Sequence, residues 1–91
     1  MTKRVYFVVH GSVQGVGFRY FTREKAREYG ITGWCRNTTD SKVEGEVQGS
    51  EEVLTKFFKD VDNGPGHAKV TKVAKEDREV EEGESGFDVT R

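Results

Sequence analysis

The residues best suited to chemistry lie in one glycine-rich segment near the start of the chain, Gly11-Ser12-Val13-Gln14-Gly15-Val16-Gly17-Phe18-Arg19. Its three glycines let backbone N–H groups converge without obstruction by side chains, and such a concave group of amides binds anions. Arg19 adds a planar guanidinium that can engage two phosphate oxygens at once. The segment therefore predicts a site for a phosphate group. The alternative is that the glycines form only a tight turn and Arg19 is a solvated residue.

Two common phosphate motifs are absent from this segment. A Walker A loop would continue with Gly-Lys-Ser/Thr after its last glycine, and a dinucleotide fingerprint would need glycine or alanine where Tyr20 stands. Nucleotide binding therefore has no motif support. Neither histidine has the spacing of a metal ligand, so we expect no metal and no cofactor.

Cys35 is the single cysteine, which excludes an intramolecular disulfide and a thiolate metal cluster. As a nucleophile it would need a neighbouring base, which the sequence does not identify. As a buried strand residue it would pack like a small apolar side chain, and we favour this inert interpretation. A chain without disulfides also fits a reducing compartment, so we expect a cytoplasmic protein.

Size and charge narrow the classes of partner. The chain has 91 residues, with 15 Lys and Arg against 16 Asp and Glu, and a net charge of -1. This length suits a single domain over residues 1–91, and this charge does not attract nucleic acid or an anionic membrane. No run of about 18 apolar residues is present, as a membrane span would require. We expect a monomer with no nucleic-acid or membrane partner.

The apolar pattern indicates two helices separated by strands. Apolar positions recur at helical spacing from Phe18 to Tyr29, and Gly30 follows as a natural stop. The clearest helix begins after Ser50, a good N-cap that precedes two glutamates. Strands are expected over residues 5–10, 31–38 and 43–49, around 70–73, and at 87–89. The highly charged segment 75–85 is interpreted as a solvated strand edge or loop.

This βαββαβ order predicts the ferredoxin-like sandwich of the α+β class, an antiparallel sheet with two helices on one face. If the first crossover is right-handed, the first and second strands run parallel with the third between them. Their C-terminal ends then share one edge of the sheet. The segment after residue 10 should therefore lie close to Asn37.

Three stretches of the chain resemble the acylphosphatase family. The segment Gly11–Arg19 looks like the signature loop of that family, and Gly33-Trp34-Cys35-Arg36-Asn37 resembles its second signature. The stretch Val43-Glu44-Gly45-Glu46-Val47-Gln48-Gly49 is similar to the family's third strand and its exit into the second helix. Cys35 departs from the aliphatic residue more usual there, and this touches no functional position.

The resemblance implies hydrolysis of the carboxyl–phosphate bond of acyl phosphates, by water attack at phosphorus, without a metal. Arg19 would bind the phosphoryl group and Asn37 would orient the water. Independently of the resemblance, the Thr38 hydroxyl could hydrogen-bond nearby and hold the Asn37 amide in place. The loop residues implied in substrate binding are Val13, Gln14, Gly15, Val16, Gly17 and Phe18. The alternative for Asn37 is a hairpin-end residue that tolerates unusual backbone angles.

A binding module is the competing class, because the same fold serves RNA-recognition and regulatory domains. An RNA-binding version should carry aromatic and basic residues on its central strands, but residues 43–49 contain no aromatic and two glutamates. An anion-binding domain without catalysis would use Arg19 equally well. Asn37 distinguishes these two alternatives, because binding alone does not need a water-positioning amide.

Overall fold

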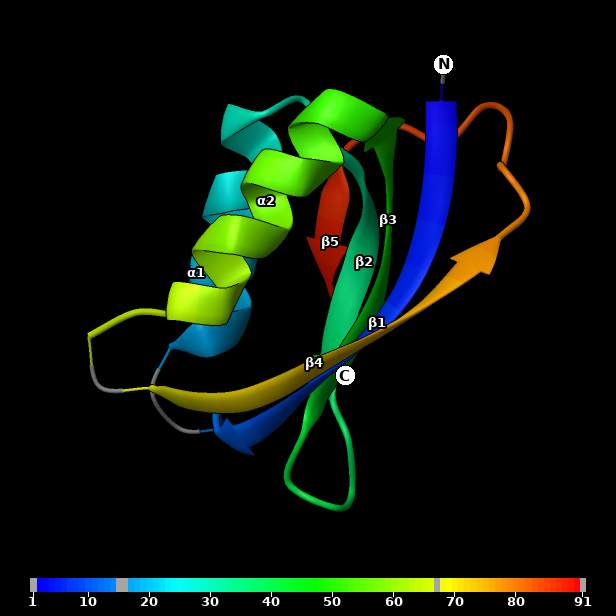
Figure 1. Cartoon of the computed structure of the whole chain (residues 1–91). Helices are drawn as coiled ribbons and strands as arrows, with labels where there is room; N and C mark the ends of the chain where they lie inside the picture. Colours follow the sequence, from blue (N-terminus) through cyan, green and yellow to red (C-terminus); the bar gives the residue numbers. More distant parts are fainter. Residues whose placement is uncertain (1, 15–16, 67, 91) are drawn as a thin grey trace.

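The structure is a computed structural model that describes residues 2–14, 17–66 and 68–90. Seven elements follow one another along the chain (Figure 1). They are β1 (Thr2–Ser12), α1 (Phe18–Glu28), β2 (Thr32–Asn37), β3 (Val43–Ser50), α2 (Glu51–Asn63), β4 (Lys69–Arg78) and β5 (Phe87–Val89). The predicted order of helices and strands is confirmed, including the short last strand.

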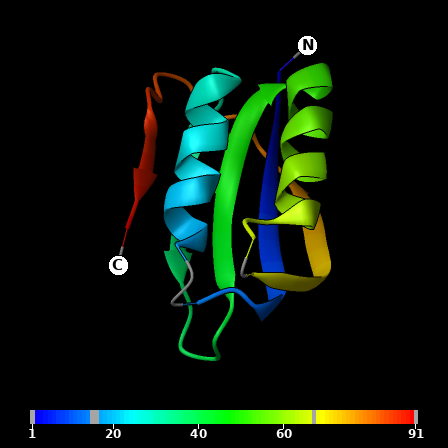
Figure 2. The same cartoon turned by 90° about the vertical axis from the view of Figure 1, so that its left-hand side faces the viewer.

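The strands form one sheet in the order β4-β1-β3-β2-β5, and both helices cover the same face of it (Figure 2). The pairs β1–β4, β1–β3 and β2–β3 are antiparallel, so β1 and β2 run parallel with β3 between them, as expected. The predicted fully antiparallel sheet is corrected at its edge. There β5 pairs parallel with β2, which makes the five-stranded sheet mixed. The fold is the α+β, ferredoxin-like arrangement.

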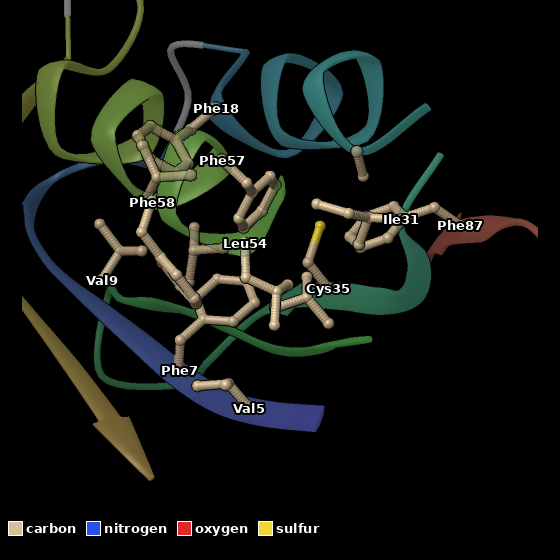
Figure 3. Packing of buried hydrophobic residues seen from close by; sticks show 14 of the residues in the cluster. Val5, Phe7, Val9, Phe18, Ile31, Cys35, Leu54, Phe57, Phe58 and Phe87 are labelled. Atoms are coloured by element: carbon tan, nitrogen blue, oxygen red, sulfur yellow. The ribbon is translucent and has the colours of Figure 1, made fainter. Parts of the chain in front are cut away.

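The core lies between the sheet and the two helices (Figure 3). Alternate residues of β1 point into it, and among them Phe7 and Val9 are fully buried. The ring of Phe7 meets those of Phe57 and Phe58 edge-on, with centroids 6.1 and 5.7 Å away. These contacts join the central strand to α2.

The sequence signals at the helix ends match the structure. The Ser50 side chain accepts a hydrogen bond from the backbone N–H of Val53 at 3.3 Å, which caps α2. Helix α1 ends at Glu28, and Gly30 follows with a φ of 69°. Near the same end of α1, the hydroxyl of Tyr29 donates to Asp60 at 2.6 Å and links the two helices.

The charged segment 75–85 is exposed at every residue except Glu84, as expected for a solvated strand edge or loop. Its first residues extend β4, and the following loop connects β4 to β5 on the side of the sheet away from the helices (Figure 1). Arg4 lies on that side with its side chain 1% exposed, and it forms ion pairs with Glu46, Glu81 and Glu84. Gln48 bonds to the backbone of Glu81 through both its amide oxygen and its amide nitrogen. This Arg4 cluster, comprising these five residues, attaches the loop to the sheet.

Candidate active site

The N-terminus of α1 is arranged to attract an anion. Gly17 is its N-cap residue, with a φ of 74° that favours glycine, and no described side chain caps the helix there. The first turn of α1 contains no acidic residue, whereas α2 begins with Glu51 and Glu52. The positive end of the α1 dipole and its unpaired N–H groups therefore remain available to a negative ligand.

A pocket of about 220 Å³ opens at this helix end. Its lining comes from the described ends of the loop between β1 and α1, the first turn of α1 and the end of β2. These segments lie together at the end of the sheet where β1 and β2 finish (Figure 2). The lining residues are Val13, Gly17, Phe18, Arg19, Tyr20 and Asn37. The two residues predicted to carry the chemistry, Arg19 and Asn37, therefore face the same space, as the strand order requires.

Asn37 presents a buried acceptor that has no partner among the described residues. It is the last residue of β2 and its backbone pairs with Val43 of β3. Its side-chain Oδ1 is buried, yet no described residue donates a hydrogen bond to it. Buried polar atoms are nearly always satisfied in proteins, so this oxygen is suited to accept a hydrogen bond from a ligand or a water molecule.

The loop residues implied in substrate binding have different placements. Val13, Gly17 and Phe18 line the pocket, and Val13 and Phe18 are each 1% exposed and belong to the core. Gly15 and Val16 lie outside the described residues. The loop is thus anchored to the core on both sides of its two central residues.

The side chain of Gln14 is directed at the β2–β3 hairpin. Its amide nitrogen donates to the backbone oxygens of Thr38 and Lys42, both at 2.9 Å. Gln14 does not line the pocket beside Arg19 and Asn37. These bonds instead tie the glycine-rich loop to the hairpin that follows Asn37. The sequence predicts Gln14 among the substrate-binding loop residues but does not reveal this bracing contact, whose acceptors lie 24 and 28 positions away.

Thr38 also differs from its expected role. Its hydroxyl bonds to Asp40 and to both backbone groups of Lys42, at 2.5 to 3.3 Å, rather than to the Asn37 amide. Bonds from Lys42 and Thr38 lower the pKa of Asp40 to about 2. Thr38 therefore stabilises the hairpin turn, and any influence on Asn37 passes through the backbone.

Cys35 has the surroundings of a structural residue. It is fully buried, and burial raises the pKa of its thiol to about 12 despite the nearby positive charges of Arg19 and Arg23. A thiol of this kind carries almost no thiolate near neutral pH. The inert interpretation of Cys35 agrees with this environment.

Residues 2–14, 17–66 and 68–90 contain no cluster of three or more His, Cys, Asp or Glu side chains arranged to hold a metal ion. Neither described helix has the length and apolar character needed to cross a membrane.

Comparison with known proteins gives consistent matches. The family model described as Acylphosphatase matches residues 5–89. An acylphosphatase of Geobacillus kaustophilus is 45% identical over 85 residues, covering 93% of this chain and 90% of the relative. One from Geobacillus thermodenitrificans is 42% identical with the same coverage. The crystal structure of acylphosphatase from Bacillus subtilis superposes with a TM-score of 0.93 over the whole of both chains, at 35% identity.

Proposed function

The chain belongs to the acylphosphatase family, and from this premise we propose that it hydrolyses the carboxyl–phosphate bond of acyl phosphates, with Arg19 binding the phosphate and Asn37 orienting water. The products are a carboxylate and inorganic phosphate. The observation that carries the assignment of residues is the shared pocket, which Arg19 and Asn37 line from different elements.

Phosphate binding rests on three sources of positive potential. Arg19 lies in the first turn of α1, where its guanidinium can form two parallel bonds to phosphate oxygens. The N-terminus of α1, which no described side chain caps, contributes its N–H groups and the helix dipole. Backbone amides at the described end of the glycine-rich loop, such as that of Gly17, are the third source. Together they would stabilise the charge that spreads over the phosphoryl oxygens in the transition state.

Asn37 has the role of orienting the attacking water molecule. The buried Oδ1 can accept a hydrogen bond from a water molecule and so direct the oxygen lone pair of that water toward phosphorus. The leaving group is a carboxylate, which is already a stable anion and does not need a proton at the moment of bond cleavage. Positioning and charge stabilisation are therefore sufficient chemistry, and the proposed reaction uses neither a metal nor a phosphorylated enzyme.

The proposal also covers the oligomeric state and the cellular compartment of the enzyme. We propose activity as a monomer, because the fold of a single chain already brings Arg19 and Asn37 to the same pocket. The single cysteine supports a reducing compartment such as the cytoplasm.

Hydrolysis of benzoyl phosphate in the presence of EDTA tests this function directly. We expect turnover that EDTA does not reduce, and in water labelled with oxygen-18 we expect the label in the phosphate product rather than in benzoate. A protein that binds inorganic phosphate but releases none from benzoyl phosphate would instead be a binding module. Label in benzoate would contradict attack at phosphorus.

A further inference from the structure

An exposed aromatic ring borders the phosphate pocket. Tyr20 lines that pocket next to Arg19, yet the residue is 57% exposed. Only one other large hydrophobic residue of the described chain is exposed, Val80, which lies in the β4–β5 loop. Exposed aromatic surface at the mouth of a pocket is available to contact the part of a ligand that projects outward.

A second guanidinium is placed over this ring. The central carbon of the Arg23 guanidinium lies 5.0 Å from the centroid of the Tyr20 ring, a cation–π distance. Arg23 is one helical turn beyond Arg19 on α1, so the two side chains share a face of the helix. Both positive charges act on the Cys35 thiol of β2 and oppose the rise of its pKa, which places both near that strand. Arg19 and Arg23 thus form two cationic positions on one side of the molecule.

We propose that Tyr20 and Arg23 form a subsite for the acyl part of the substrate, and that this subsite favours acyl groups bearing a second negative charge. The inference rests on the proposed function, because the phosphate must occupy the Arg19 position. The acyl group of the bound substrate then projects out of the pocket past Tyr20. The Tyr20 ring contacts the carbon atoms of the acyl group. A carboxylate or phosphate further along the acyl group meets Arg23.

A matched pair of substrates isolates this charge effect. We would compare kcat/KM for 4-carboxybenzoyl phosphate and for its neutral counterpart, 4-carbamoylbenzoyl phosphate, each corrected for its rate of hydrolysis without enzyme. The two acyl groups have nearly the same shape and differ by one charge. We expect the wild type to prefer the anionic substrate by about two- to fivefold at low salt, the range for a solvent-exposed ion pair. Added salt should reduce this preference.

Variants assign the preference to Arg23. Arg23→Gln should bring the ratio of the two kcat/KM values to about one, whereas Arg23→Lys keeps the charge and should retain the preference. Arg27→Gln is the matched control, because it removes the same charge from an exposed site one turn further along α1 and should leave the ratio unchanged. Tyr20→Ala should lower kcat/KM for both substrates more than Tyr20→Phe does.

The possible outcomes distinguish failure of the acyl subsite from failure of the proposed hydrolytic function on which it rests. A wild-type ratio of one or less, or a ratio that Arg23→Gln leaves unchanged, would overturn the subsite while hydrolysis of benzoyl phosphate upheld the proposed function. Failure to hydrolyse benzoyl phosphate and both substituted substrates would overturn the proposed function and the subsite together. Loss of the preference in Arg23→Gln alone among the three arginine variants would support the subsite.

Discussion

The Arg4 cluster should make a large contribution to stability, and Arg4→Met tests it. Methionine keeps most of the aliphatic length of the side chain but removes the guanidinium. That guanidinium is 1% exposed and faces carboxylates of Glu46, Glu84 and Glu81, which are 23%, 18% and 64% exposed. The substitution would leave these carboxylates together without their cation.

The magnitude follows from the exposure of the partners. Removing one member of a fully buried ion pair costs about 3–5 kcal/mol of the free energy of unfolding. Water reaches the carboxylates here, so we expect a smaller loss of about 2–3 kcal/mol for Arg4→Met. In a domain of this size that loss lowers Tm by roughly 10–20 °C.

Urea and thermal denaturation followed by circular dichroism would measure this effect. Glu81→Gln is the matched control, because its carboxylate is mostly exposed and its loss should cost less than about 1 kcal/mol. If Arg4→Met were no less stable than Glu81→Gln, the loop would be attached by something other than this cluster, and the reasoning would be wrong.

Three further predictions concern acid stability, the loop brace and the thiol. Burial tends to raise the pKa of Glu84, but hydrogen bonds from Arg4 and Thr32 outweigh it and hold the pKa below the ordinary 4.5. The folded protein therefore binds fewer protons here than the unfolded chain, so this stabilisation is complete above pH 4.5 and is lost as pH falls through the lowered pKa. Urea denaturation at pH 7 and pH 3 should show the loss, and Glu84→Gln should show a smaller one. Gln14→Leu removes two hydrogen bonds between the loop and the hairpin, and should cost about 1–3 kcal/mol of the free energy of unfolding. Gln14→Leu should also lower kcat with benzoyl phosphate, and a variant with unchanged stability and kcat would show that the brace is dispensable. Cys35 should resist a thiol reagent in the native protein and react after unfolding in urea, while Cys35→Ala should keep its activity within about twofold, and loss of turnover in this variant would revive the nucleophile interpretation.

Local signals predicted most of the fold. Ser50 marks the start of α2 because a hydroxyl can satisfy a free backbone N–H group, and the hydrophobic spacing marks the buried face of α2. The meeting of Arg19 and Asn37 also followed from the sequence, since the strand order brings the ends of β1 and β2 to one edge. The first argument uses local sequence signals, and the second uses the general rules by which strands and helices are connected.

Contacts between distant polar residues were the ones that sequence reasoning missed. Nothing near Arg4 indicates that it will be buried, because its partners arrive from β3 and from a loop about 80 positions later. The charges of that loop indicate solvent exposure, which holds for every charged residue except Glu84, and the crossing from β4 to β5 brings Glu84 against Arg4. Gln14 is a similar case, since its partners are carbonyl groups that no residue type reveals. The parallel pairing of β5 depends equally on the path of this connection.

The central claim is that Arg19 binds the phosphate while Asn37 positions the water. One comparison of two variants tests it most directly. It measures kcat for benzoyl phosphate and the inhibition constant of inorganic phosphate in Asn37→Ala and Arg19→Ala. We predict that Asn37→Ala abolishes turnover while its phosphate inhibition constant, read from residual activity or by calorimetry, stays close to that of the wild type. Arg19→Ala should lose both turnover and phosphate binding. Most of the wild-type rate surviving in Asn37→Ala would contradict the assignment of water positioning to this side chain.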